Sequence, residues 1–473
     1  MRKKKPTVTL ENLLFTAYAA EGKSIAHHEG KVIFVSGVIP GDRADVVLVK
    51  NKKDWAEGRV LRLVTPSDKR MTPFCRHFGT CGGCKWQHMP YEMQLECKEK
   101  EVAENIRRIA GTVPEEFLPI LGSDQQRAYR NKLEFTFSTK SYLPYESLGD
   151  ATVSPDRPAL GYHAPRIFDK VIDIQECHLM DEVNNKIRNL IRDYAFANDA
   201  DFYDIREHKG WLRNIILRYT TTGQLMVNIC FGEERKQARE KLLAYLLTSV
   251  PEITTLLYTI NPKHNDTIYD LVPEVYHGPG HVTERLGHLQ FIISPKSFFQ
   301  TNTLQAEKLY GIVRDFAGLT GKETLYDLYC GTGSIGLFLA EKAGKVIGVE
   351  VIAQAVEDAQ KNATANGIEN AQFFCGDVIK ICDNAFFHEH GQPEVVITDP
   401  PRAGMHEKLV KKLLEMEANR IVYVSCNSAT MARDLALLLE KYDVKKCQPV
   451  DMFPHTHHIE SVVLLDKKQT LNP

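Results

Sequence analysis

The sequence predicts an α/β fold with a parallel sheet in the C-terminal part of the chain, and two segments lead to this prediction. Leu325–Gly336 is an apolar strand that runs directly into a loop with three glycines. A helical pattern over Leu337–Lys342 follows, and a second strand, Lys345–Glu350, then ends in an acid. A strand, a glycine loop, a helix and a second strand in this order are typical of a Rossmann-like domain.

The glycine loop predicts a nucleotide-like ligand. Gly331, Gly333 and Gly336 fit the G-x-G-x-x-G pattern, and Glu350 lies at the spacing of an acid that binds the two hydroxyls of a ribose. Glycines let the backbone turn tightly and approach a ligand closely. The pattern alone does not separate NAD from S-adenosylmethionine.

Three further strand ends carry reactive side chains. Glu394–Arg402 is a strand that stops at Asp399 and two prolines, and Arg420–Asn427 is a strand that ends at Cys426. Ligands of open α/β sheets bind at the carboxyl ends of strands, so both residues are expected beside the glycine loop. Glu460 stands at the start of the last strand, which suits an antiparallel neighbour. Hydride transfer needs no thiol at this edge, whereas methyl transfer to carbon does.

A cysteine pattern in the N-terminal half predicts a metal centre. Cys75, Cys81 and Cys84 have the spacing C-x5-C-x2-C, and Cys177 is the candidate fourth thiolate. This spacing leaves zinc and an iron–sulfur cluster equally open. Three histidines near these thiols are further possible zinc ligands: His77, His88 and His178.

Length and composition fit a cytoplasmic protein of two or three domains. The chain has 473 residues, 43% of them hydrophobic and 25% charged, and no apolar run approaches the length of a membrane span. Its basic start is not followed by a signal-peptide core. The net charge is −2, but residues 1–70 hold 14 Lys and Arg against 8 Asp and Glu. A basic N-terminal module suits RNA binding, and an ordinary solvated surface explains the same charge equally well.

The first 66 residues read as a small five-stranded barrel of the OB type. Its expected strands are Val8–Tyr18, Lys31–Val35, Ala44–Lys50 and Trp55–Val64. A helix is expected over residues 91–111, and residues 130–295 read mostly as strands. Trp211–Thr220 and Gln224–Phe231 are expected to form a hairpin.

Together, five segments resemble the RNA 5-methyluridine methyltransferases of the RumA/TrmA type. They occur in the family's order: Phe298–Asn302, Asp327–Gly333, Asp399–Arg402, Ser425–Asn427 and His458–Glu460. One position departs from the family pattern, because Ser428 replaces the usual proline after Ser-Cys-Asn, which predicts a less stiff loop. A base-nitrogen methyltransferase is the rival for Asp-Pro-Pro, but that class has an aromatic residue where this chain has Arg402.

The resemblance implies roles for individual residues. Cys426 would be the nucleophile that adds to C6 of uracil, with its pKa lowered by nearby groups, and Glu460 would be the base. The residues implied to bind S-adenosylmethionine are Gln300, Tyr329, Gly331, Glu350 and Asp399, with Asp377 placed where such folds contact adenine. The resemblance also favours a [4Fe–4S] cluster on Cys75, Cys81, Cys84 and Cys177.

The resemblance implies three domains and an RNA substrate. The expected domains are a TRAM-like, RNA-binding barrel (1–66), a central domain with the cysteine loop (67–295) and a methyltransferase domain (296–473), on which helix 91–111 packs. The cysteine loop and the barrel favour carbon-5 of a uridine in 23S rRNA. A tRNA or dual-site methyltransferase and a non-catalytic RNA-binding assembly factor are the alternatives. Three basic residues are candidate RNA contacts: Arg130, Lys132 and Arg213.

Overall fold

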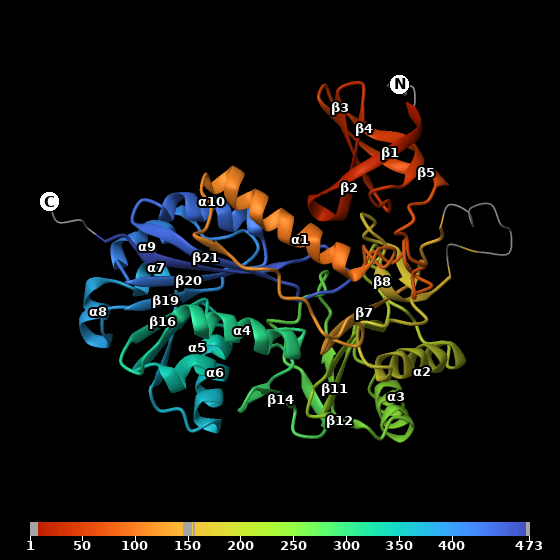
Figure 1. The fold of residues 1–473 in the computed structure, drawn as a ribbon. Helices are drawn as coiled ribbons and strands as arrows, with labels where there is room; N and C mark the ends of the chain where they lie inside the picture. Colours follow the sequence, from red (N-terminus) through yellow and green to blue (C-terminus); the bar gives the residue numbers. More distant parts are fainter. Residues whose placement is uncertain (1–7, 145–153, 155–156, 470–473) are drawn as a thin grey trace.

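A computed structural model describes residues 8–144, 154 and 157–469 of the chain. It contains an N-terminal barrel, a seven-stranded sheet and an eight-stranded sheet, together with a two-stranded hairpin. Figure 1 shows the barrel standing above the rest of the molecule, beside the end of a long helix that reaches across to the eight-stranded sheet.

The barrel is closed, with the strand order β1-β2-β3-β5-β4. Its strands are β1 (Thr9–Ala19), β2 (Lys23–His28), β3 (Lys31–Ser36), β4 (Arg43–Asn51) and β5 (Trp55–Thr65). The five-stranded barrel is confirmed, but β2 was missed among the expected strands. Its inward side chains are Ser24 and Ala26, which are too small and too weakly hydrophobic to reveal a strand by alternation.

The seven-stranded sheet forms the centre of the molecule, in the order β13-β12-β11-β10-β7-β8-β9. Its strands are β7 (Lys132–Ser138), β8 (Ala159–His163), β9 (Val171–Asp173), β10 (Leu212–Tyr219), β11 (Leu225–Phe231), β12 (Ile253–Ile260) and β13 (Glu274–His277). The expected hairpin is β10 paired antiparallel with β11. Figure 1 shows two helices beside this sheet, α2 (Val183–Ala197) and α3 (Lys236–Ser249).

The eight-stranded sheet has the order β18-β17-β16-β19-β20-β22-β21-β6. Its strands are β6 (Glu116–Phe117), β16 (Thr324–Leu328), β17 (Lys345–Glu350), β18 (Ala371–Cys375), β19 (Val395–Thr398), β20 (Arg420–Ser425), β21 (Tyr442–Val450) and β22 (Glu460–Lys467). β16 to β20 are parallel, while β22 runs antiparallel between β20 and β21. This arrangement confirms the Rossmann-like fold class.

Helices cover both faces of this sheet and bury two separate hydrophobic cores against it. They are α4 (Thr303–Ala317), α5 (Ser334–Leu339), α6 (Ala353–Ala365), α7 (Val378–Ile381), α8 (Asn384–His390), α9 (Glu407–Met416) and α10 (Ser428–Leu438). The hairpin β14 (Val282–Leu286) and β15 (Leu289–Ile293) packs against α4 and α6. It thereby joins the two sheets.

Helix α1 (Tyr91–Asn105) comes from the N-terminal half of the chain but packs on the eight-stranded sheet, beside α10 (Figure 1). A π-helical turn, Ile106–Ala110, continues it and buries Ile106 in the same core. The Lys98 ammonium, fully buried, donates to Asp451 at 2.6 Å. A buried ion pair therefore holds α1 on the eight-stranded sheet.

In the described part of the chain, every helix is too short or too polar to cross a bilayer.

Breaking the Lys98–Asp451 pair should destabilise the sheet strongly. Lys98→Met keeps the length of the side chain but leaves a buried carboxylate without its partner, which costs about 3 to 5 kcal/mol. Lys411→Met is the matched control, because the Lys411–Glu407 pair is exposed and solvent screens its attraction, so its loss should leave stability nearly unchanged. Denaturant unfolding should therefore separate the two variants. Equal losses of stability in both would contradict this assignment.

Candidate active site and cysteine centre

The candidate catalytic residues lie at one edge of the eight-stranded sheet. Asp399 directly follows β19 and Cys426 directly follows β20, and these strands are parallel neighbours. β22 is antiparallel to β20, with Ser425 paired to Ser461, so the start of β22 lies where β20 ends. Glu460, its first residue, therefore arrives beside Cys426. The antiparallel placement expected from the sequence is what brings the two together.

Cys426 lies half-buried among carboxylates. Burial, followed by the charges of Glu460 and Asp399, raises the pKa of its thiol to about 11, and Arg402 opposes this shift. The expectation that neighbouring groups lower this pKa is therefore wrong for the free protein. Two acids and one arginine face the thiol, and the acids outweigh the arginine.

Glu460 is 5% exposed, and the same surroundings act on it. Burial, followed by the charge of Asp399, raises the pKa of Glu460 well above its usual range, and Arg402 opposes this shift. Burial also raises the pKa of Asp399 to about 7. Because a cation near these groups stabilises their ionised forms, this edge of the sheet favours a positively charged ligand.

Arg402 was missed as a functional residue, although it lies in the Asp-Pro-Pro-Arg segment. It is the cation that acts on both Cys426 and Glu460. Its side chain lies 3.3 Å from the His458 ring, and its carbonyl accepts a hydrogen bond from Asn427 at 3.1 Å. Its position just beyond β19, in the same segment as Asp399, was the available signal.

The loop after Cys426 is held on two sides. The Asn427 side chain caps α10 by accepting from Ala429 and Thr430. The Ser428 hydroxyl accepts a hydrogen bond from Asn105 of α1 at 2.8 Å. The departure from proline at this position therefore exchanges a rigid ring for a bond to another helix, instead of leaving the loop loose.

The glycine loop is stabilised by two buried acids. Glu350 accepts from the Gly331 amide at 3.1 Å and from the Ile352 amide at 2.9 Å. Because each carboxylate oxygen accepts more than one bond, Glu350 retains acceptor capacity for ribose hydroxyls. Asp327 accepts from the Gly336 amide at 2.8 Å, and burial raises the pKa of Asp327 to about 7.

Tyr329 leads into this loop with a φ of 62°, a left-handed conformation that is rare for residues other than glycine. Its ring lies in the electrostatic field of Asp377 and Glu350, whose charges add to burial in raising its pKa. The Asp377 side chain accepts from the Ile379 amide and caps α7. That bond explains the acid at this position, and the contact with adenine remains a prediction.

Gln300 lies at the junction of the two sheets. The Asn131 side chain donates to the Gln300 carbonyl at 2.9 Å. Two residues earlier, the Phe298 carbonyl accepts from the Thr332 hydroxyl of the glycine loop at 3.5 Å. The segment that carries Gln300 therefore lies beside the glycine loop. The contact of Gln300 with the cofactor remains a prediction.

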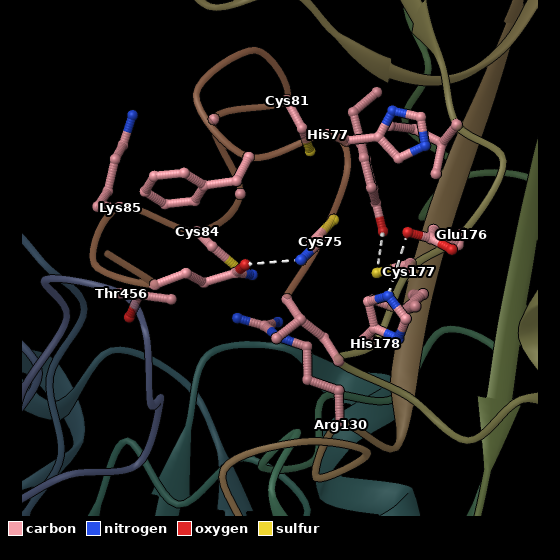
Figure 2. A pocket seen from close by; sticks show the side chains of 18 of the residues that line it. Cys75, His77, Cys81, Cys84, Lys85, Arg130, Glu176, Cys177, His178 and Thr456 are labelled. Atoms are coloured by element: carbon pink, nitrogen blue, oxygen red, sulfur yellow. Dashed lines mark hydrogen bonds and ion pairs between the residues drawn. The ribbon is translucent and has the colours of Figure 1, made fainter. Parts of the chain in front are cut away.

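The four predicted metal ligands line one cavity of about 490 Å³. Figure 2 shows the thiols of Cys75, Cys81, Cys84 and Cys177 around a common space. Burial, with the charges of the neighbouring thiols, raises the pKa of Cys81 to about 11 and that of Cys84 to about 12. Keeping these sulfurs ionised therefore requires a positively charged group between them.

Two sets of possible metal ligands border this cavity. In the described part of the chain, the ligand atoms of Cys75, Glu176 and His178 all lie within 4.8 Å of one another. The four thiols form the second set. Four thiolates fit either a zinc ion or an iron–sulfur cluster, so the choice between them stays a prediction.

The expected RNA contacts divide into two kinds. Arg213 is 1% exposed, pairs with Asp266 at 2.7 Å and donates to three backbone carbonyls. The prediction that Arg213 contacts RNA is therefore wrong, because its side chain is buried and its charge is paired inside the protein. Arg130 lines the cysteine cavity together with His458, so it remains a candidate, as does the half-buried Lys132.

The fold and this edge of the sheet define an S-adenosylmethionine-dependent methyltransferase, and comparisons with known proteins identify its family. The model of the tRNA (uracil-5-)-methyltransferase family matches residues 280–468. An uncharacterized RNA methyltransferase of Porphyromonas gingivalis is 50% identical over 95% of this chain and 98% of its own. One from Bacteroides thetaiotaomicron is also 50% identical, over 95% of this chain and 99% of its own.

A solved structure supports the same conclusion. The tRNA (uracil-54, C5)-methyltransferase of Pyrococcus abyssi, in complex with S-adenosyl-L-homocysteine, has a TM-score of 0.72 and 26% identity. The match covers 96% of this chain and all of that one. The chain belongs to the uracil-5 RNA methyltransferase family, and it is an enzyme that acts on RNA.

The pKa of Cys426 predicts a steep pH dependence of its alkylation. Because only the thiolate reacts, the iodoacetamide rate at Cys426 should rise about tenfold per pH unit between about pH 7 and pH 10. Glu460→Gln removes one of the charges that raise this pKa, so its rate should exceed that of the wild type. Glu440→Gln, at an exposed position, is the control. Peptide mapping separates Cys426 from the exposed Cys375, and a flat profile at Cys426 would contradict the assignment.

Proposed function

We propose that this enzyme methylates carbon-5 of a uridine in 23S rRNA through a covalent bond between Cys426 and C6 of uracil. One observation carries the proposal: Cys426 and Glu460 lie at the same edge of the sheet, where the glycine loop also begins. A nucleophile and a base at one edge of the sheet match the two protein groups that the reaction needs.

The first step activates the uracil ring. The Cys426 sulfur bonds to C6, and the electrons of the C5=C6 double bond move toward C5 and the O4 carbonyl. S-adenosylmethionine, when bound, supplies an electrophilic methyl group on a positively charged sulfur. Arg402 lowers the pKa of Cys426, so it favours the thiolate that begins this step.

The second step releases the product. C5 would take the methyl group, and the bond between that methyl and the sulfonium sulfur would break to leave neutral S-adenosylhomocysteine. C5 then carries both the new methyl group and its original proton. Glu460 accepts this proton, the C5=C6 double bond forms again, and the C6–S bond breaks to return the Cys426 thiolate. The raised pKa of Glu460 makes its carboxylate a strong base once ionised, and Arg402 favours that ionised form.

The cofactor contacts follow from the positions of the predicted residues. We propose that Glu350 binds the ribose hydroxyls and that Gly331, Tyr329, Gln300 and Asp399 border the rest of the cofactor. Asp377 would contact the adenine. The half-buried, carboxylate-rich edge at Asp399 supports this proposal, because a sulfonium is positively charged.

We propose that Cys75, Cys81, Cys84 and Cys177 hold a [4Fe–4S] cluster. The resemblance to the rRNA members of the family and the shared cavity of the four thiols support it. We also propose three domains, 1–66, 67–295 and 296–473, with the TRAM-like barrel binding RNA. The reaction would take place in the cytoplasm, in keeping with eleven cysteines that form no disulfide.

A tRNA substrate is the second candidate, because the Pyrococcus abyssi relative is named for uracil-54 of tRNA. Nuclease digestion and mass spectrometry of rRNA and tRNA from a strain that lacks the enzyme would distinguish the two. Loss of 5-methyluridine from 23S rRNA supports the proposal, and loss from tRNA alone contradicts it.

Glu460→Gln should stop the reaction at its second step. The amide keeps the size and hydrogen bonding of the side chain but cannot take the C5 proton, so attack and methyl transfer should proceed while release stalls. A methylated RNA–protein complex should therefore accumulate and survive a denaturing gel. Normal turnover, or failure before any complex forms, would contradict the role of Glu460.

Cys177→Ser should remove the cluster. Anaerobically purified wild-type protein should be brown and contain iron with acid-labile sulfide, because four thiolates ligate the cluster. Cys97→Ser is the control, since Cys97 packs near Trp86 outside the cysteine cavity and its loss should leave the iron content unchanged. Colourless wild-type protein that holds only zinc would contradict the proposal.

A further inference from the structure

The loop between β21 and β22 bends at His455, which is 6% exposed and has a φ of 63°. A histidine in this left-handed region is strained and persists only where the surroundings hold it firmly. The loop leads directly to Glu460. The contacts that hold His455 therefore bear on the position of the proposed base.

The cysteine loop holds the carbonyl of His455. The backbone amides of Lys85 and Trp86 donate to this oxygen at 2.7 and 3.1 Å. These two residues directly follow Cys84. A group bound between the cysteines would therefore restrain the segment whose amides bind the His455 carbonyl.

The ring of His455 touches the cysteine centre from another direction. Phe74 packs edge-on against the His455 ring at 5.1 Å and against the His178 ring at 5.5 Å. Phe74 precedes Cys75, and His178 follows Cys177. Neighbours of Cys75 and Cys84 thus contact this one histidine, and Phe74 links it to His178, the neighbour of Cys177.

Helix α1 contacts the backbone amide and the ring Nδ1 of His455. The Gln94 side chain accepts from the His455 amide at 2.8 Å, and its nitrogen lies 3.2 Å from the ring Nδ1. The same nitrogen donates to the carbonyls of Trp86 and Met89 at 3.1 and 3.2 Å. Gln94, fully buried, therefore ties the cysteine loop and the β21–β22 loop into one unit.

The β21–β22 loop connects His455 to the edge of the sheet that holds Cys426 and Glu460. Three residues after His455, the His458 ring contacts Arg402, which faces both Cys426 and Glu460. Thr456 and His458 also line the cysteine cavity. The cysteine centre and the catalytic edge therefore share one loop.

We propose that His455 is a positioning residue that couples the cysteine centre to the catalytic loop. The group held by the four cysteines then acts as a structural support, which we call the brace. It restrains Phe74, Lys85 and Trp86, and these three residues restrain His455. His455 in turn orients the loop that ends at Glu460. The role requires no change of oxidation state. It rests on the proposed function, because it assigns the cluster a task in delivering the base.

Hydrogen–deuterium exchange of the full-length, anaerobically purified protein tests the coupling without RNA. Gln94→Ala and Cys177→Ser should each raise the exchange of residues 453–458 by about tenfold, because each removes one side of the brace. Peptides from β16 and β17 should stay protected. Glu96→Gln, on the exposed face of the same helix, should match the wild type. Unchanged exchange at 453–458 in either variant, or a rise spread over the whole sheet, would overturn the proposal.

Substitutions of His455 provide a second arm. His455→Asn tolerates a positive φ and keeps a side-chain acceptor for Gln94, so its exchange should stay near the wild-type value. His455→Ala should resemble Gln94→Ala, and equal behaviour of both His455 variants would contradict the assignment.

With RNA, Gln94→Ala should release the covalent complex more slowly while forming it at the normal rate. If complex formation slows instead, His455 has no specific role in delivering Glu460. If Glu460→Gln traps no complex while the exchange results hold, the proposed role of Glu460 fails and the coupling through His455 stands.

Discussion

The insertion of one antiparallel strand into a parallel sheet is the constraint on which the candidate active site depends. β22 lies between β20 and β21, and its pairing with β20 sets Ser461 opposite Ser425. A parallel strand at this position would place Glu460 at the far edge of the sheet, away from Cys426. With the observed direction, a thiol that ends one strand and a carboxylate that begins the next share one edge. The rest of the site is arranged around this pair.

The electrostatics of this edge favour a cation. Three acids with raised pKa values, Asp327, Asp399 and Glu460, surround the end of the sheet, and Arg402 offsets their charge only in part. In the free protein this balance keeps the Cys426 thiol protonated, since its pKa lies at about 11. A positively charged methyl donor bound at this edge would oppose these charges and so lower the pKa of the thiol.

Much of the fold could be predicted from the sequence, because its long apolar strands and its glycine loop have strong local patterns. The strands that end at Asp399 and Cys426 are buried on both faces, and continuous apolar runs of this kind are easily recognised. β2 was missed because its buried side chains are small. The charge of Arg213 was misassigned, since its partner Asp266 lies 53 residues further along the chain. The predicted direction of the Cys426 pKa shift was wrong. This pKa depends on burial and on acids from two other strands, and the sequence spacing shows neither.

The central claim is that Cys426 bonds to the uracil ring, and a trapped complex tests it most directly. Fluorine at C5 cannot leave as a proton does, so RNA with 5-fluorouridine at the target should remain attached to the enzyme. After digestion with protease and nuclease, mass spectrometry should find a methylated 5-fluorouridine on the peptide that contains Cys426, and Cys426→Ala should give no such product. A complex linked through another residue, or near-normal methylation of RNA by Cys426→Ala, would contradict the account.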